Sequence, residues 1–335
     1  MSIRILQVLL SPRIGGAESL VAALQDAWED EGIVAKTVYV DPGRAGGRFR
    51  RWSELRKEIR FFGPEVIVAH SAIPGVYARS QFLRSIPVIS VIHSAQDDHK
   101  ALKLLIAEKI LRRWTAAVVT VSAGQAADYR RHFSDRVPVS VIPNGISDKL
   151  PLKEFHASRV RRISEIARVT DQKEPRLWIS AAEEFLKIHG DVEFDWWGPF
   201  DEDARRKYHL PTLSPISFRG PTTVAGQVLL ETDIYFHTST REAHSIGLLE
   251  AAAVGVPIVC SKSVALTLPD HLPAAVFDDG DPLAAAAALE IVVSSFTDCV
   301  ARAYANATQV RAVSGIVQCR QAYDDVIASV LRPKE

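Results

Sequence analysis

The sequence has few cysteines, no excess of charge and no long apolar run. Only three of its 335 residues are cysteines, and Cys260, Cys299 and Cys319 lack the close spacing of a zinc site. Three unpaired thiols also argue against a disulfide framework and are typical of a reducing cytoplasm. The 40 basic and 40 acidic side chains balance to a net charge of zero. Affinity for a nucleic acid or a membrane would therefore have to come from a local patch.

Signals for targeting and for membrane insertion are also missing. The N-terminus, MSIRILQVLLSPR, has too short an apolar core and no small-residue cleavage site, so no signal peptide is predicted. No uninterrupted apolar run reaches the length that a bilayer requires. We therefore expect a cytoplasmic protein, located in the cytosol or peripherally at the inner face of the membrane.

Short runs rich in β-branched residues alternate with longer segments that can form helices. This alternation indicates parallel sheets built from βαβ units, and the chain length favours two domains. Strands are predicted at 3–10, 34–40, 65–70, 87–93, 116–122, 139–145, 161–169, 192–198, 216–220, 233–239, 257–261 and 274–279. The pattern weakens at 148–156, which is predicted to be a linker. The segment 313–332 is predicted to be one long amphipathic helix.

Ligands of parallel sheets bind beyond the carboxyl ends of the strands. The loop after the first predicted strand, PRIGG (12–16), is glycine-rich and opens a helix. Gly15 and Gly16 would let the backbone approach a phosphate at the helix N-terminus. The three-glycine spacing of a dinucleotide fingerprint is absent, and a tight turn without a ligand is the alternative interpretation.

Two glutamates stand out in the segment TSTREAHSIGLLEAAAVGVPIVCS (238–261). Glu242 falls in the loop after a predicted strand, and Ser245 is a good N-cap for the helix that follows. Glu250 falls in the second turn of that helix, where it could accept hydrogen bonds from a ribose diol while a diphosphate rests on the first amides. The alternative is a solvated loop residue and a partly exposed helix residue. The amides concerned are those of Ile246, Gly247 and Leu248.

This segment resembles the signature of the family-four retaining glycosyltransferases of the GT-B fold. The family pattern, Glu-Gly-Phe-Gly-Leu, two residues, Leu-Glu-Ala and then Gly-x-Pro-Val-Val, is matched here by EAHSIGLLEA (242–251) and GVPIV (255–259). Further matches cover nearly the whole chain: GGAE (15–18), VIPNGI (141–146), IARVTDQKE (166–174) and a last helix that contains Tyr323.

The resemblance implies a fold and an activity. The fold would be α/β, with two doubly wound Rossmann-like domains and a cleft between them. Residues 1–150 would bind the acceptor, 151–315 would bind the nucleotide sugar, and the helix in 316–335 would pack back on the first domain. The activity would be that of a retaining, metal-independent hexosyltransferase without a cofactor. It would move a sugar from a UDP- or GDP-linked donor to a hydroxyl of a glycan or lipid-linked acceptor in cell-envelope polysaccharide biosynthesis.

The resemblance also implies roles for individual residues. Arg168 and Lys173 would neutralise the donor diphosphate, a role that fits the charge gained by the leaving group. Glu242 would bind the transferred sugar and Glu250 the ribose. His93 would face the reacting sugar. Further expected donor contacts are the phosphate-binding backbone from Ser245 to Leu248 and a stacking contact from His244.

The sequence departs from the family pattern at several glycines of these loops. Ala167 and Glu174 stand where the family has glycines beside the arginine and the lysine, and Ala243 replaces the glycine after Glu242. None of these changes removes a charge that the chemistry needs. They bear on how the loops approach the donor phosphates and sugar.

A basic segment lies in the first half of the chain. Residues 44–62 carry seven arginines and lysines against two glutamates, with Trp52, Phe61 and Phe62 among them. A phosphate-bearing acceptor or an anionic membrane surface would suit this segment; a solvated helix face is the alternative, and no motif for RNA accompanies it. A second basic amphipathic helix is predicted at 100–114.

Two other functions stay open at this stage. One is a non-catalytic scaffold of the same fold, which the joint presence of Arg168, Lys173, Glu242, Glu250 and His93 argues against. The other is a nucleotide-sugar epimerase, which would need no acceptor.

Overall fold

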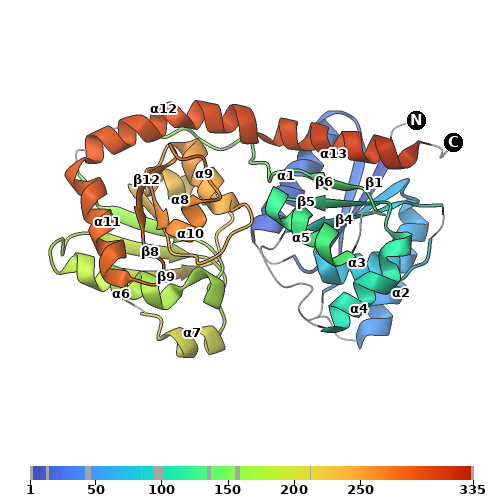
Figure 1. Ribbon diagram of the computed structural model, residues 1–335, viewed down its shortest axis with the longest axis horizontal. Helices are drawn as coiled ribbons and strands as arrows, with labels where there is room; N and C mark the ends of the chain where they lie inside the picture. Colours follow the sequence, from blue (N-terminus) through green and yellow to red (C-terminus); the bar gives the residue numbers. More distant parts are fainter. Residues whose placement is uncertain are drawn as a thin grey trace. The chain divides into compact units, whose positions relative to one another are not determined.

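The computed structural model describes residues 3–12, 15–41, 47–83, 85–93, 102–133, 137–154, 159–211 and 213–332. The chain divides into two compact units (Figure 1). The first is formed by the N-terminal part up to Gly145, together with the C-terminal residues from Ile316. The second runs from Ile146 to Gly315, and Gly15 and Gly16 group with it.

The first unit contains a six-stranded sheet in which all paired strands are parallel. Its strands follow the order β2-β1-β3-β4-β5-β6. They are β1 (Arg4–Leu9), β2 (Val34–Tyr39), β3 (Val66–His70), β4 (Val88–Ile92), β5 (Ala117–Thr120) and β6 (Val139–Val141). The helices are α1 (Gly16–Asp30), α2 (Gly47–Phe62), α3 (Ala72–Arg79), α4 (Leu102–Leu111), α5 (Ala123–Phe133) and α13 (Ile316–Leu331), with a 3-10 turn η1 (Arg112–Trp114) after α4.

The C-terminal helix α13 completes the core of this unit by packing on α1. Trp28 is fully buried, and its indole Nε1 donates a hydrogen bond to Oδ1 of Asp324 at 2.7 Å. The ring of Tyr323 meets the Trp28 ring edge-on, with 6.2 Å between the centroids. Arg320 extends the contact to Glu31. A tryptophan buried with its N–H satisfied combines a large apolar area with a specific polar contact.

A buried polar cluster ties three other helices of the unit together. Arg79 and Glu108 are almost inaccessible to solvent and form an ion pair of 2.7 Å. The phenol of Tyr129 donates to Oε1 of Glu108 at 2.9 Å. Burial and the neighbouring Glu108 carboxylate raise the pKa of Tyr129, so the phenol stays protonated and acts as the donor.

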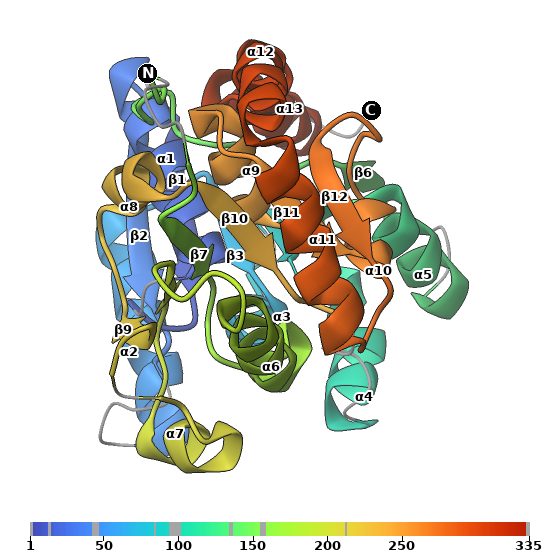
Figure 2. The same cartoon turned by 90° about the vertical axis from the view of Figure 1, so that its left-hand side faces the viewer.

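The second unit contains a second six-stranded parallel sheet, in the order β12-β11-β10-β7-β8-β9 (Figure 2). The strands are β7 (Arg162–Ile166), β8 (Glu193–Trp197), β9 (Ile216–Gly220), β10 (Ile234–His237), β11 (Ile258–Ser261) and β12 (Pro273–Phe277). The helices are α6 (Pro175–Leu186), α7 (Glu202–Tyr208), α8 (Ala225–Glu231), α9 (Ile246–Val254), α10 (Lys262–Ala265), α11 (Pro282–Ser294) and α12 (Phe296–Ser314), with a 3-10 turn η2 (Asp171–Lys173).

Aromatic packing dominates the core of the second unit. Trp178 of α6 is fully buried, and its ring meets those of Trp196, Phe194 and Phe218 edge-on, with centroids 5.3 to 5.9 Å apart. Edge-to-face pairs of this kind stabilise beyond the area that they bury. The core fixes β8 and α6 against β7, and β7 leads into the loop at 167–174.

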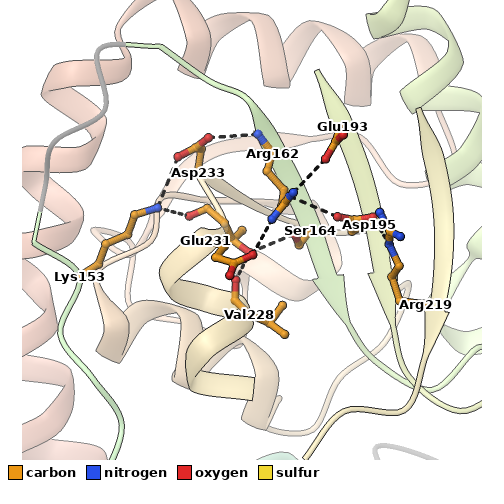
Figure 3. A network of polar contacts seen from close by, with 10 residues as sticks. Lys153, Arg162, Ser164, Glu193, Asp195, Arg219, Val228, Glu231 and Asp233 are labelled. Carbon is orange, nitrogen blue, oxygen red and sulfur yellow. Dashed lines mark hydrogen bonds and ion pairs between the residues drawn. The ribbon is translucent and has the colours of Figure 1, made fainter. Parts of the chain in front are cut away.

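The predicted linker is in fact bound to the second unit. Lys153 donates to the backbone carbonyl of Thr232 and lies 3.4 Å from Oδ1 of Asp233 (Figure 3). The other oxygen of Asp233 accepts bonds from the backbone amides of Arg161 and Arg162. Residues 148–154 are therefore held by specific contacts, and 155–156 lie outside the described residues.

The prediction of a single helix over 313–332 was wrong at its start. Val313 and Ser314 end α12, a 19-residue helix that the periodicity did not reveal. Gly315 has extended backbone, with ψ 156°, so the chain leaves the helix there before α13 begins at Ile316. Among the described residues no single helix combines the length and apolar character needed to cross a bilayer; α11 and α12 do so only as a pair, bent by 88°.

The strand order locates the ligand-binding edge of each sheet. The direction of chain progression reverses between β1 and β3 in the first unit and between β7 and β10 in the second. Ligands of doubly wound sheets bind in the crevice at such a reversal, outside the carboxyl ends of the strands. A ligand-binding site of the second unit is therefore expected at the loops that follow β7 and β10.

Candidate functional site

Two loops of the second unit are joined at the carboxyl ends of β7 and β10. The Thr240 amide donates to the carbonyl of Gln172 at 3.1 Å, and the Gln172 side chain donates to the carbonyl of Arg241 at 2.6 Å. Thr238 adds a bond from its hydroxyl to the carbonyl of Lys173 at 2.9 Å. These bonds bring the predicted basic loop and the predicted glutamate loop together.

Lys173 and Glu242 meet in this assembly. The Lys173 ammonium donates to Oε1 of Glu242, and only 9% of the glutamate side chain is exposed. Nε2 of His237 lies 3.3 Å from the same oxygen. Burial opposes ionisation of Glu242, but the charge of Lys173 and the contact with His237 outweigh it and lower the pKa. Glu242 is therefore a buried carboxylate that stays charged.

Arg168 lies on the same loop but makes no such pair. Its side chain is exposed, and its guanidinium donates no hydrogen bond and forms no ion pair within the described ranges. The loop backbone here is pressed against Gly198, where an added Cβ would lie 1.8 Å from the carbonyl oxygen of Ala167. Only a glycine fits at 198, so the backbone of the loop is fixed closely against the end of β8.

Glu174 takes a backbone conformation that glycine adopts more easily. Its φ of 51° and ψ of 55° are left-handed, and it precedes Pro175 at the start of α6. The loop therefore keeps its turn despite the departure from the family's glycine. The left-handed conformation costs a non-glycine residue roughly 1–2 kcal/mol.

The N-terminus of α9 follows the glutamate loop. Ser245 is its N-cap residue, as predicted, although its side chain makes no capping hydrogen bond. The first amides of a helix have no intrahelical acceptor, so those of Ile246, Gly247 and Leu248 can receive an anion. Gly247 allows this end of the helix to approach β7: an added Cβ would lie 2.5 Å from the Tyr235 hydroxyl and 2.9 Å from the Ile166 carbonyl oxygen.

Glu250 lies on the second turn of α9, half-buried. Burial raises its pKa to about 7. No hydrogen bond or ion pair to its carboxylate occurs within the described residues. His244, between the two glutamates, is also half-buried, and burial lowers its pKa, so its ring is neutral near pH 7. A neutral ring suits the stacking role predicted for it.

The remaining candidates lie at the carboxyl ends of strands in the first unit. His70 ends β3 and His93 follows β4, and Nδ1 of His70 lies 3.0 Å from Nε2 of His93 with the rings stacked. Burial lowers the pKa of His93 to about 4, partly opposed by a hydrogen bond with Asn144. Burial and the neighbouring His93 lower the pKa of His70 as well. Both rings are therefore neutral at pH 7 and share one N–H···N bond.

The predicted glycine loop is only partly described. Gly15 and Gly16 are described, and Gly16 begins α1, as the sequence predicts. Arg13 and Ile14 of the same loop lie outside the described residues.

Sequence analysis missed two buried residues that contact Glu242 directly or through one another. They are His237 at the end of β10 and Glu165 inside β7, both with fully inaccessible side chains. The signal was present: a glutamate inside the apolar strand RISEI and a histidine that ends IYFH are both unusual in buried strands. In the described part of the chain, no group of three or more His, Cys, Asp or Glu side chains is arranged to hold a metal ion.

Comparison with known proteins supplies the family. A model of Glycosyltransferase Family 4 matches residues 11–150, and a model of Glycosyl transferases group 1 matches residues 161–295. The chain belongs to the GT-B glycosyltransferases. The two models together span most of its length, and their junction falls where the two units meet in the sequence.

Solved structures share the fold of this glycosyltransferase at low sequence identity. Anabaena HepE in complex with UDP and glucose has a TM-score of 0.80 at 16% identity, covering 98% of this chain and 100% of HepE. Sucrose-phosphate synthase from Thermosynechococcus elongatus has a TM-score of 0.78 at 16% identity, with coverage of 98% and 100%. The lipopolysaccharide outer core galactosyltransferase WaaB has a TM-score of 0.64 at 15% identity, with coverage of 98% and 99%. A search of curated proteins gave no match.

Replacing Gly247 by alanine tests the approach of α9 to β7. The new methyl group would meet a tyrosine hydroxyl and a backbone carbonyl, so we expect Gly247→Ala to lower the free energy of unfolding by about 1–3 kcal/mol. Gly124 is the matched control, because it is also the second residue of its helix and its nearest neighbour would lie 4.0 Å from an added Cβ. Urea unfolding of both variants is the measurement; equal stability would contradict the close contact.

The pKa of Glu250 predicts a pH-dependent stability. The folded protein holds this proton up to about pH 7, whereas an unperturbed glutamate releases it near pH 4.5. The contribution of Glu250 to the free energy of unfolding must therefore fall as the pH rises from 4.5 to 7. Glu250→Gln removes this loss, so its melting temperature should equal that of the wild type near pH 4.5 and exceed it above pH 7. Glu183→Gln, at an exposed position of α6, is the control for the loss of a carboxylate as such; a gain above pH 7 as large as that of Glu250→Gln would contradict the prediction.

Proposed function

We propose that this glycosyltransferase moves a sugar from a UDP-linked donor to a hydroxyl of a glycan or lipid-linked acceptor, with retention of configuration and without a metal ion. One observation carries the proposal. The carboxylate of Glu242, the ammonium of Lys173 and the N-terminus of α9 are assembled at the strand-order reversal of the second unit. Such a position is where a doubly wound sheet binds its ligand.

Each part of this assembly suits one part of a nucleotide sugar. The amides at the start of α9 would receive the diphosphate. Glu250, whose carboxylate has no bond within the described residues, would accept bonds from the ribose diol when ionised. Glu242 would accept a hydroxyl of the transferred sugar. His93 is assigned the contact with that sugar that the family resemblance implies.

Two cations would stabilise the leaving group. Negative charge grows on the diphosphate as the glycosidic bond breaks, and fixed positive charges lower the energy of that state. Arg168 is free to turn toward a ligand, and Lys173 has three donors of which Glu242 needs one. These cations can serve in place of a divalent metal, which is the basis for proposing metal independence.

The choice of donor and pathway rests on the related structures. HepE was crystallised with UDP and with UDP-glucose, which supports a uridine diphosphate donor here. WaaB is a galactosyltransferase of the lipopolysaccharide outer core, which supports a role in cell-envelope polysaccharide assembly. Both comparisons rest on similarity of fold. We further propose that the enzyme is cytoplasmic and meets its acceptor at the inner face of the membrane.

Ligand-induced stabilisation tests the donor site. We expect UDP and UDP-sugars, rather than GDP or ADP, to raise the melting temperature, because a ligand that binds the folded state stabilises it according to its occupancy. EDTA should not change the shift. Arg168→Ala should abolish most of it and slow turnover by about 10²–10³-fold, whereas Arg159→Ala, which removes another exposed arginine of the second unit, should leave both unchanged. No shift with any nucleotide would contradict the donor site.

Product analysis tests the reaction itself. The anomeric configuration of the product, read by NMR, should equal that of the donor. Conversion of the nucleotide sugar without an acceptor would instead indicate an epimerase.

The helix α2 supports contact with an anionic membrane. One face of the helix is buried through Leu55 and Ile59, whereas the side chains of Phe49 and Phe61 are 80% and 89% exposed. Exposed cations lie beside them, among them Arg50, Lys57 and Arg60. Exposed aromatics between cations match the headgroup region of an anionic bilayer. Arg44 to Gly46 of the predicted basic segment lie outside the described residues.

Vesicle sedimentation tests this contact. The protein should bind vesicles rich in phosphatidylglycerol but not vesicles of phosphatidylcholine alone, and salt should weaken the binding. Reversing two charges in Lys57→Glu/Arg60→Glu should reduce partitioning by more than about 10-fold, since each cation near the surface contributes about 1 kcal/mol. The same reversal at two exposed cations of the second unit, Lys187→Glu/Arg206→Glu, is the control. Equal binding of the two double variants would exclude α2 as the contact.

A further inference from the structure

Glu165 and His237 form a fully buried charged pair beneath the candidate site. They come from the neighbouring strands β7 and β10, and neither side chain is accessible to solvent. Nδ1 of His237 lies 2.7 Å from Oε1 of Glu165. A buried carboxylate is costly unless a charge compensates it, so the histidine is what allows Glu165 to be there.

The two neighbouring carboxylates favour an imidazolium at His237. Its other nitrogen, Nε2, lies 3.3 Å from Oε1 of Glu242, within hydrogen-bond distance. Nδ1 is close to Glu165 but is not aligned for a hydrogen bond with it, so that contact acts through charge, and the two carboxylates together favour a protonated ring. Burial lowers the pKa of His237, but Glu165 and the bond to Glu242 outweigh burial and the repulsion from Lys173, and the pKa is raised. The other titratable groups against the ring are Tyr235, which stacks on it, and Cys260 in register on β11. Burial raises the pKa of both, so they stay neutral.

The contacts of Glu242 are confined to one of its two oxygens. Oε1 receives both the imidazolium of His237 and the ammonium of Lys173. Oε2 accepts no hydrogen bond within the described residues. Glu165, His237, Glu242 and Lys173 thus form a chain of alternating charges that ends on a carboxylate with one acceptor oxygen left over.

We propose that Glu165 and His237 are positioning residues of the donor site, which act through Glu242 and reserve its Oε2 for a hydroxyl of the transferred sugar. The assignment of that hydroxyl rests on the proposed function. The pair touches neither the nucleotide nor the sugar. Its effect is to keep Glu242 ionised and fixed by two donors, so that the carboxylate does not turn when the sugar binds.

A change at Glu165 should weaken the binding of the transferred sugar but not that of the nucleotide. Glu165→Gln keeps the shape of the side chain but removes the charge that keeps His237 protonated. We expect the affinity for UDP-glucose to fall by about 10- to 100-fold, the range for losing a hydrogen bond to a charged group. The affinity for UDP, measured in the same calorimeter, should change less than about 2-fold because UDP lacks the transferred sugar, which is the group that Glu242 would contact. Equal losses for both ligands, or no loss for either, would overturn the proposal.

Two further experiments distinguish a positioning role from a purely structural one: a double-mutant cycle of Glu165 with Glu242, and an apolar replacement of Glu165 and His237. Glu242→Gln should produce the same selective loss, and adding Glu165→Gln to it should produce little more, since the two act on one contact. The double variant Glu165→Leu/His237→Leu replaces the buried pair by apolar groups and should keep the wild-type melting temperature or raise it. It should still lose affinity for UDP-glucose and retain affinity for UDP. Additive losses in Glu165→Gln/Glu242→Gln would show that Glu165 does not act through Glu242.

The protonation of His237 can be read without any ligand. In long-range ¹H–¹⁵N spectra of the full chain, we expect both ring nitrogens of His237 to carry protons at pH 7.5 in the wild type, and one of them to lose its proton in Glu165→Gln. A neutral His237 in the wild type would refute the charge chain. If the wild type binds neither UDP nor UDP-glucose, the proposed function fails, while the spectra still decide whether the charge chain exists.

Discussion

Two carboxylates and two cations are buried together where β7 and β10 end, and each depends on the others for its charge. In the charge chain that we propose, His237 compensates Glu165, and His237 and Lys173 together compensate Glu242. Removing one partner from such a group leaves an uncompensated charge in the interior, which costs several kcal/mol. The loops that carry Lys173 and Glu242 are therefore fixed by electrostatics as well as by their backbone hydrogen bonds, which preorganises the proposed donor site.

Close backbone packing supplies the rest of that shape. Gly198 lets β8 lie against the basic loop, and Gly247 lets the first turn of α9 reach the end of β7. Both glycines act by leaving out a side chain, whereas Glu174 holds a left-handed turn that it adopts at a cost. Small changes at these positions would move charged groups by more than a hydrogen bond tolerates.

Much of this architecture could be predicted from local patterns. The strands of both sheets are short β-branched runs, and Glu242, Ser245 and Glu250 belong to a contiguous signature whose spacing is set by one loop and one helix. The contact between Glu165 and His237 could not be predicted, because the two residues lie on strands that are distant in sequence and become neighbours only through the strand order. Helix α12 was missed because an alanine-rich helix with a scattered apolar pattern has no strong period.

The position of α13 in the chain has a consequence for synthesis on the ribosome. The second unit is made from one nearly continuous stretch, but the core of the first unit includes Trp28 against a partner 296 positions later, Asp324. At translation rates of about 5–20 residues per second, roughly 15–60 s pass between the synthesis of Trp28 and that of Asp324. During this interval the apolar side chains that α13 later covers, Trp28 among them, stay exposed on the nascent first unit, and transiently exposed apolar surface favours aggregation.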